Sequence, residues 1–128
     1  MQLGEQLHKN HLLNGESFNF GPQAEYSHTV QEILEKMSMR WNFNNPKEAY
    51  QITDDIKFHE AGLLKLNCDK ALFHFRWLPT LNYQTLIEFT SDWYFEFYKN
   101  KSDMFAYTIK QVETYEELAI KKNVEWTK

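Results

Sequence analysis

Residues 83–101 constrain the fold most, because apolar and aromatic side chains recur there at the spacing of an α-helix. Asn82 precedes the segment and is the predicted N-cap, since a short side-chain oxygen accepts free N–H groups of a first helical turn. The stripe consists of Leu86, Ile87, Phe89, Trp93, Tyr94, Phe97 and Tyr98. A stripe this broad predicts a helix that packs against more than one neighbour.

A second helix is predicted from about residue 27, with Ser27 or Thr29 as its N-cap. Its apolar residues fall largely on one face, and core packing is the expected role of such a face. They are Val30, Ile33, Leu34, Met37 and Met39. Residues 42–46 follow as a polar turn.

Two further helices are predicted near the ends of the chain. The first ends at Asn14-Gly15, and because the chain opens in what reads as the middle of a helix, we expect a part that precedes it. The other begins at Ser102 or Asp103, and residues 123–128 are expected to be frayed. The apolar positions are Leu3, Leu7, Leu12 and Leu13 in the first, and Phe105, Ile109, Val112, Tyr115 and Leu118 in the other.

Short strands are expected between the helices. Residues 17–20 alternate polar and aromatic side chains before Gly21-Pro22 breaks the pattern, and residues 63–66 form a short apolar run. Residues 52–58 are a further candidate for an extended segment. Asn67 or Asp69 caps a short helix after the second run, and Pro79 ends that helix. The predicted fold class is α+β, mainly helical, in a single small lobe.

Composition limits the class of protein. The 128 residues suffice for one domain with a real core, and the net charge of −4 argues against a nucleic-acid or membrane-surface binder, so neither partner is expected. No apolar run approaches the roughly 18 residues of a membrane span. The N-terminus lacks the layout of a secretory signal, and Cys68 is the single cysteine. We expect a cytoplasmic protein.

The motifs of several enzyme classes are missing from the sequence. Its glycines, Gly4, Gly15, Gly21 and Gly62, form no Gly-x-Gly-x-x-Gly turn for a dinucleotide. No Gly-x-Ser-x-Gly elbow and no His-Glu-x-x-His pair occurs. We therefore expect no catalytic residue and no cofactor bound by this chain.

Five histidines raise the question of a metal site. They are His8, His11, His28, His59 and His74. The first two could share a helix face, but no set of histidines and carboxylates recurs at ligand spacing, so no metal is expected. Cys68 is expected to be a small hydrophobe rather than a nucleophile.

Three blocks carry a family resemblance, and they cover most of the chain. They are Phe18-Asn19-Phe20-Gly21-Pro22; then His59-Glu60-Ala61, Leu64-Lys65-Leu66, Lys70-Ala71 and Trp77-x-Pro79; and finally Thr90-Ser91-Asp92-Trp93-Tyr94. In content and order they resemble the C-terminal lobe of the extended short-chain dehydrogenase/reductases that act on sugar nucleotides. Within that family, the likeness is to the CDP-glucose 4,6-dehydratases.

The resemblance implies that residues 1–128 form one substrate-binding lobe, without the N-terminal Rossmann domain that holds NAD. Such enzymes are lyases of lipopolysaccharide O-antigen sugar biosynthesis: they oxidise the sugar at C4, eliminate water across C5–C6 and return the hydride to C6. The Tyr-x-x-x-Lys pair of the superfamily is missing, since Tyr94 and Lys99 are one residue too far apart. We expect a partial enzyme that cannot catalyse alone.

The resemblance also assigns binding residues. In related enzymes an acidic residue seven positions before the helix-opening Asp binds the nucleotide ribose, and counting back from Asn67 gives Glu60. A basic residue three positions earlier contacts the pyrophosphate, which here is Lys57; lysine keeps the charge but lacks the two-pronged geometry of arginine. His59 belongs to the same cluster.

Asn19 and Gly21 of the first block lie near the ligand-facing edge in such lobes, and Gly21 allows close backbone approach. The implied ligand of all five residues is CDP-glucose, bound weakly or not at all by this chain alone. From residue types alone, the charged cluster also fits an ordinary solvated loop, and Asn19 with Gly21 also fits a strand end and a turn.

Two residues depart from the family pattern. Asn67 stands where relatives have Asp, and it can still cap a helix. Arg76 stands where relatives have Gly, a residue that often serves a helix end of positive φ, so arginine either strains that turn or marks a changed one.

The competing interpretation is a stand-alone, divergent lobe that acts as an interaction or structural protein. Its aromatic surface between Phe89 and Tyr98 would be covered in a complete enzyme, and when exposed it favours self-association.

Overall fold

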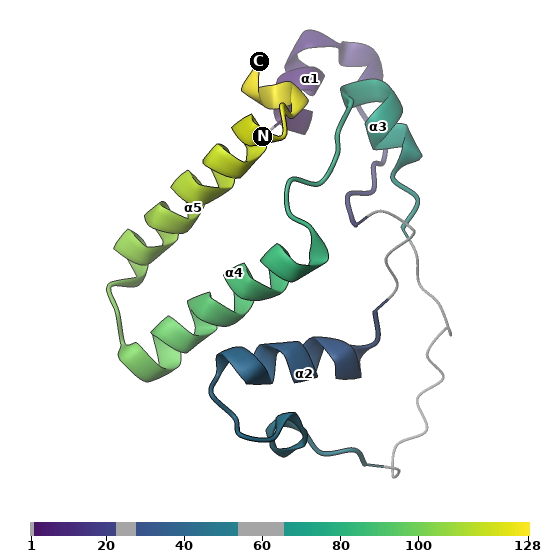
Figure 1. The fold of residues 1–128 in the computed structure, drawn as a ribbon. Coiled ribbons are helices and arrows are strands. Elements are labelled where there is room, and N and C mark those ends of the chain that lie inside the picture. Colours follow the sequence, from purple (N-terminus) through teal and green to yellow (C-terminus); the bar gives the residue numbers. More distant parts are fainter. Residues whose placement is uncertain (1, 23–27, 54–65) are drawn as a thin grey trace.

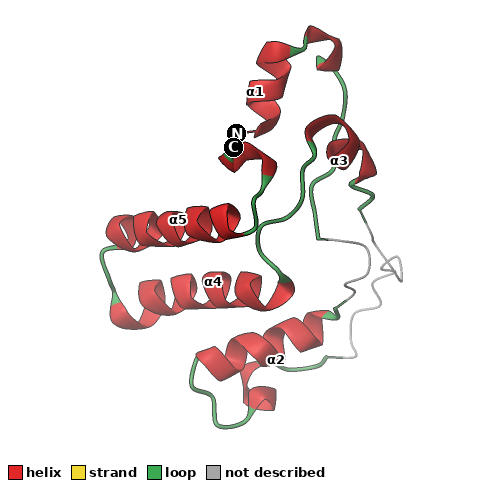
Figure 2. Ribbon diagram, turned by 45° about the horizontal axis from the view of Figure 1, so that its top comes forward, coloured by secondary structure: helices red, strands yellow, loops and turns green. Residues whose placement is uncertain are grey.

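The chain folds into helices joined by irregular segments (Figures 1 and 2). The computed structural model describes residues 2–22, 28–53 and 66–128, and no residue in these ranges belongs to a β-strand. The α-helices are α1 (Gln2–Lys9), α2 (Val30–Arg40), α3 (Asp69–Phe75), α4 (Tyr83–Phe95) and α5 (Met104–Lys121). The mainly helical prediction is confirmed. Of the helices described, none is long and apolar enough to cross a bilayer.

The predicted strand at residues 17–20 does not form, although its alternation of side chains is present. The Phe18 ring lies 4.6 Å from that of Phe75, and the Phe20 ring lies 5.1 Å from that of Trp77. Asn19, between them, bonds to a different segment. A strand needs a main-chain ladder, and side-chain packing holds this segment instead. The predicted extended segments at residues 52–58 and 63–66 lie largely outside the described residues.

Each of the longer helices begins at a predicted capping residue. The Thr29 hydroxyl accepts from the Glu32 N–H at 3.2 Å, and the Glu32 carboxylate accepts from the Thr29 N–H at 2.9 Å, which is a capping box. The Asn82 side chain accepts from the Thr85 N–H at 2.9 Å. The Asp103 side chain accepts from the first turn of α5. These caps satisfy N–H groups that have no partner inside a helix.

Helix α4 lies between α2 and α5 in both views (Figures 1 and 2). On the α5 side, the Trp93 indole donates to the Thr108 hydroxyl at 3.0 Å, and the Gln111 amide donates to the Phe89 carbonyl at 2.9 Å. On the other side, Arg40 at the end of α2 forms an ion pair with α4. The prediction that this helix has more than one neighbour is confirmed.

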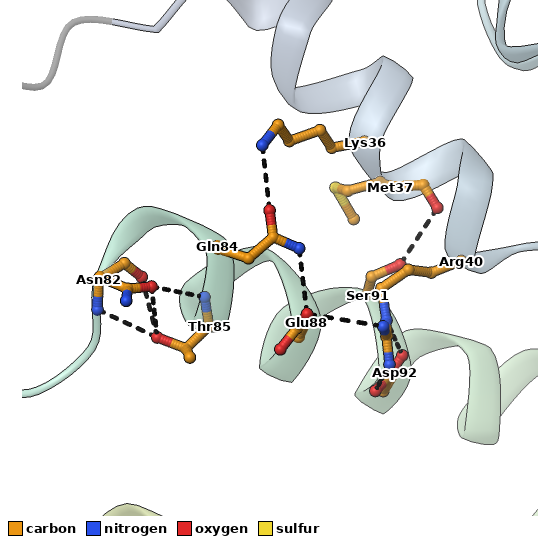
Figure 3. A network of polar contacts seen from close by, with 9 residues as sticks. All are labelled: Lys36, Met37, Arg40, Asn82, Gln84, Thr85, Glu88, Ser91 and Asp92. Carbon is orange, nitrogen blue, oxygen red and sulfur yellow. Dashed lines mark hydrogen bonds and ion pairs between the residues drawn. The ribbon is translucent and has the colours of Figure 1, made fainter. Parts of the chain in front are cut away.

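Helices α2 and α4 approach closely at Ser91 (Figure 3). This side chain is fully buried, and its hydroxyl donates to the Met37 carbonyl at 3.3 Å. The Trp41 indole donates to the Ser91 carbonyl at 3.1 Å, and the Lys36 ammonium donates to the Gln84 side chain at 3.0 Å. A small residue at the crossing point therefore lets both helices bond across it.

A small apolar core joins α1 and α3. Leu13, Ala71 and Phe75 are buried, and the surrounding side chains are those of Leu3, Leu7, Phe18 and Trp77. The Gln2 amide of α1 also donates to the Phe75 carbonyl at the end of α3 at 2.6 Å. The first helix therefore belongs to the same unit as the short helix that Pro79 follows.

Helix ends follow the expected chemistry at the start of the chain and depart from it at the C-terminus. After α1, a 3₁₀ turn (His11–Leu13) leads to Gly15, whose φ of 84° is left-handed. The prediction that residues 123–128 are frayed is wrong. Val124 is buried, and Trp126 stacks on Tyr115 with ring centroids 6.0 Å apart. Two apolar side chains after α5 give its end an anchor that periodicity does not reveal.

The predicted apolar faces are only partly covered. In α2, Ile33 and Met37 are half-buried, whereas Val30 is 68% exposed and Met39 is 60% exposed. In α5, the residues Phe105, Ile109 and Val112 stay exposed, because α4 contacts Thr108 and Gln111 instead. Core packing along both predicted faces was therefore overestimated.

Helix α4 continues into a π-helical turn, Glu96–Asn100, which ends at Lys101 with φ 50°. A π turn holds one residue more than an α-helical turn. The Asn100 amide donates to the Glu96 carboxylate at 2.9 Å, and Ser102 also bonds to that carboxylate. The predicted helix over residues 83–101 is thus confirmed in extent, with a changed last turn.

Candidate functional site

Two of the predicted binding residues lie against the segment that precedes α3. The Asn19 amide donates to the Asn67 carbonyl at 3.3 Å, and the Cys68 thiol lies 3.9 Å from the Gly21 carbonyl oxygen. A Cβ atom at Gly21 would lie 3.3 Å from the Leu66 side chain, which is tighter than most contacts. The absence of a side chain at Gly21 therefore lets the two segments meet.

The remaining predicted residues, Lys57, His59 and Glu60, lie outside the described residues. The described chain resumes at Leu66, directly against Gly21. The first and second blocks of the sequence motif therefore meet in space, although they are far apart in the chain.

Asn67 organises the start of α3. Its side-chain oxygen accepts from the Asp69 N–H at 2.8 Å, and its amide donates to the Asp69 carboxylate at 3.1 Å. The N-cap position itself is Cys68, which is half-buried and makes no capping bond. Asn67 can thus replace the family's aspartate at the helix start, as the sequence predicts, from one position before the cap.

An ion pair fixes the edge of this site. The Lys70 ammonium lies 2.6 Å from the Glu16 carboxylate and 4.8 Å from the centre of the Phe18 ring. The hydrogen bond from Lys70 lowers the pKa of Glu16 below the usual range of a glutamate. Lys70 therefore holds the segment before Asn19 onto α3, which is a positioning role.

Arg76 adopts the left-handed conformation that the family's glycine would favour, with φ 50° and ψ 31°. Its N–H donates to the Leu72 carbonyl at 2.8 Å and so closes α3. Of the two alternatives drawn from the sequence, the structure has the strained turn. The turn keeps the geometry of a glycine and bears the penalty of a side chain.

Most other motif residues serve the fold. Ala71 is fully buried in the small core, and Trp77 packs edge-on against Phe20. In the third block, Ser91 and Trp93 make the helix contacts described above. The resemblance therefore rests largely on residues that position the site rather than on residues that contact a ligand.

A cavity of about 940 Å³ opens beside Pro22, the neighbour of Gly21. Sequence reasoning missed it, together with the Lys122 ammonium that donates to the Thr80 carbonyl at 2.6 Å. The signal in the sequence is slight, because the cavity is built from the ends of four helices. Among the residues described, no three His, Cys, Asp or Glu side chains group as metal ligands would.

The arrangement at Asn19 can bind a polar ligand but shows no apparatus for bond breaking. Its described groups are an exposed amide, main-chain carbonyls and a thiol, and the nearest charges, Glu16 and Lys70, neutralise each other. In the described part of the chain, no acid–base pair faces this edge. Hydrogen bonding is therefore the chemistry that these residues offer.

Comparison with known proteins gives a partial match. No protein-family model and no solved structure matches the chain. Over 64 residues, the chain is 36% identical to the CDP-glucose 4,6-dehydratase of Salmonella typhimurium. The match covers 50% of this chain and 17% of the length of that relative. Half of the chain is therefore related in sequence to a short part of a sugar-nucleotide dehydratase.

Proposed function

We propose that the chain is the nucleotide-sugar-binding portion of a CDP-glucose 4,6-dehydratase-like protein, and that it is inactive alone. The observation that carries the proposal is the partial identity to such a dehydratase. The meeting of Asn19 and Gly21 with residues 66–68 supports it, because it brings two motif blocks to one edge. Glu60 would accept the ribose hydroxyls and Lys57 would neutralise the pyrophosphate.

NAD, which the family implies, does not fit the described residues. A dinucleotide pyrophosphate needs glycines in a turn between a strand and a helix. Here Gly4 lies inside α1, Gly15 forms a turn, and Gly21 packs on Leu66. We assign no redox step to this chain, and the proposed role of its residues is to bind the nucleotide of the substrate.

Titration with ligands tests the proposal. Amide chemical shifts of the ¹⁵N-labelled chain are followed by NMR while CDP-glucose, CDP or UDP is added. We expect shifts at Asn19, Gly21 and residues 57–60, larger with the cytidine ligands than with UDP. Shifts spread evenly over the molecule, or none at millimolar ligand, would count against a retained half-site.

Two variants sharpen this test. Glu60→Gln removes the acceptor proposed for the ribose, and Lys57→Ala removes the proposed phosphate contact. Each is expected to weaken CDP binding by about tenfold, the usual effect of losing one charged hydrogen bond. Glu113→Gln on the exposed surface of α5 is the matched control and should bind CDP as the unmodified chain does. Co-expression with the NAD-binding half of a dehydratase then asks whether activity is restored.

A second candidate function is self-association, which the exposed aromatic cluster favours. Trp93 stacks on Phe97 at 5.7 Å, and Tyr94 stacks on Tyr98 at 6.3 Å. Phe97 and Tyr98 also meet edge to face at 4.9 Å. Tyr94, Phe97 and Tyr98 are 44%, 47% and 60% exposed, so the four rings form one patch that is open to solvent.

A second copy of the chain is the occupant that we propose for this patch. Aromatic side chains bury about 150–250 Å² each, so half-exposed rings together with the exposed Phe105 offer a few hundred Å² of apolar surface. A standard interface buries about 800 Å² per partner, much of it in a polar rim. The patch is thus of the size that forms the centre of a dimer.

Sedimentation velocity over a range of concentrations tests self-association. We expect a monomer–dimer equilibrium that Tyr98→Ser shifts toward monomer. Leu12→Ser is the matched control, because Leu12 is 88% exposed and belongs to the 3₁₀ turn after α1. A chain that stays monomeric at high concentration, or loses association equally in both variants, would contradict this candidate function.

A further inference from the structure

The cavity of about 940 Å³ has the size of a small-molecule site. Its wall comes from the beginnings of α2 and α4 and from the segments that follow α3 and α5. None of the residues assigned above to the nucleotide sugar lines it. The cavity therefore calls for a ligand of its own, which its lining can define.

The wall is mainly aliphatic. It includes Ile33, Leu72, Leu78, Leu81, Leu86 and Val124. Leu72, Leu78 and Leu86 are 43%, 45% and 47% exposed, so much of this apolar surface is uncovered. An aliphatic body would cover it with a gain in free energy that grows with the area removed from water.

The one aromatic ring in the wall cannot stack on a ligand. The His28 imidazole lies 3.5 Å from the Tyr83 ring, with the planes 13° apart. The Lys36 ammonium lies 4.9 Å from the centre of the same ring. Because the imidazole occupies one face, the ammonium lies over the other. A ligand that depends on ring stacking, such as a nucleobase, is therefore disfavoured in this cavity.

The polar groups of the wall favour a single negative charge. Lys122 is engaged by the Thr80 carbonyl, and Glu125 is paired with Lys128 at 3.0 Å. Arg76 lines the cavity, and its guanidinium makes no hydrogen bond or ion pair to any residue that the structure describes. One available cation beside a carboxylate suits a monoanion better than a phosphate dianion.

The backbone points to the same residue. Arg76 and Asn123, with φ 50° in both, line this cavity. Left-handed backbone is costly for a residue with a side chain, and such strain is found preferentially at functional sites. The hydroxyl of Tyr83 adds an unused donor, because it is buried without a hydrogen-bond partner among the described residues.

We propose that this cavity binds an aliphatic monocarboxylate, with its chain against the leucine-rich wall and its carboxylate held by Arg76. The guanidinium fork matches the two oxygens of a carboxylate, which an ammonium cannot do. The Tyr83 hydroxyl completes the polar end as a donor. This site is separate from the proposed nucleotide site, and it stands or falls independently of it.

The test uses three probes that share a ten-carbon chain. Sodium decanoate, decan-1-ol and decyltrimethylammonium are titrated into the ¹⁵N-labelled chain, and the amide shifts of Leu72, Ile87 and Val124 are followed. We expect decanoate to bind at least tenfold more tightly than the alcohol, and the cation to bind least. Equal affinity for decanoate and decanol, or no shift at these residues, would overturn the proposal.

Variants assign the role of Arg76. Arg76→Gly suits the left-handed backbone and removes the charge, so it should fold and weaken decanoate binding by about tenfold or more while leaving decanol unchanged. Lys101→Gly is the matched control, because Lys101 has the same φ of 50° and lies outside the cavity wall. Leu86→Trp should fill the cavity and abolish binding of both probes. Unchanged decanoate affinity in Arg76→Gly would overturn the proposal.

Discussion

Arg40 and Asp92 join α2 to α4 through a two-pronged ion pair, in which Nε of Arg40 lies 2.5 Å from Oδ1 of Asp92. The second prong runs from the guanidinium to the other carboxylate oxygen, and Glu88 lies 3.8 Å from the same guanidinium. Both side chains of the pair remain about one-third exposed. The pair therefore fixes the angle between two helices whose apolar faces cover each other only in part.

Asp92→Asn should lower the free energy of unfolding by about 1 kcal/mol, since a partly exposed pair with two-pronged geometry lies at the upper end for surface ion pairs. Urea denaturation at low and at high salt measures this, and the loss should shrink as salt screens the pair. Lys9→Ala breaks the exposed pair within α1 and should cost less than half as much. Equal losses in both variants would argue against a special role for the pair.

Arg76→Gly should raise the free energy of unfolding by about 1 kcal/mol, because glycine adopts a left-handed backbone without steric penalty. Gly15→Ala should change stability by a similar amount in the opposite direction. At Gly15, φ is 84° and no atom lies within 4 Å of the added Cβ, so the change isolates backbone strain. Thermal unfolding of both variants checks the pair of signs, and destabilisation by Arg76→Gly would contradict the prediction.

Ala71→Leu should destabilise the chain by about 1–3 kcal/mol, because the side chain is fully buried against Leu13 and Phe75 and leaves no room for larger groups. Ala106→Leu makes the same change at an exposed position of α5 and should have little effect. Chemical denaturation compares the two. If Ala71→Leu were harmless, the small core between α1 and α3 would have to be loosely packed.

Lys70→Met should raise the pKa of Glu16 toward its ordinary value, because the hydrogen bond from Lys70 is the main cause of the lowered pKa. A lowered pKa in the folded state gives stability that is present above the unfolded pKa and is lost as pH falls through the folded one. Carboxyl chemical shifts across the acidic range measure the change. Lys110→Met on the exposed surface of α5 is the control and should leave Glu16 unaffected.

Local chemistry made the helix starts predictable. Thr29, Asn82 and Asp103 all cap as expected, because a capping bond joins residues only two or three positions apart. The positive φ at Arg76 could likewise be anticipated from the glycine that stands there in the resembling family. Such features depend on neighbours in the chain, which the sequence displays directly.

Packing between distant segments was not predictable in the same way. Apolar periodicity in α5 singles out Phe105 and Val112, yet the contacts with α4 are polar and fall on Thr108 and Gln111. The strand expected at residues 17–20 failed because its partner is a set of aromatic rings rather than another backbone. The cavity beside Pro22 depends on four helix ends meeting, which no local pattern encodes.

The π-helical turn Glu96–Asn100 makes the length of the chain at this point as important as its residue types. Deleting a single codon within the turn would restore α-helical bonding and rotate everything beyond it by about 100° about the helix axis. Tyr98 would leave its stack with Tyr94, and the start of α5 would be re-aimed. Homologues that differ here by one residue should therefore present a different aromatic surface without any substitution in it.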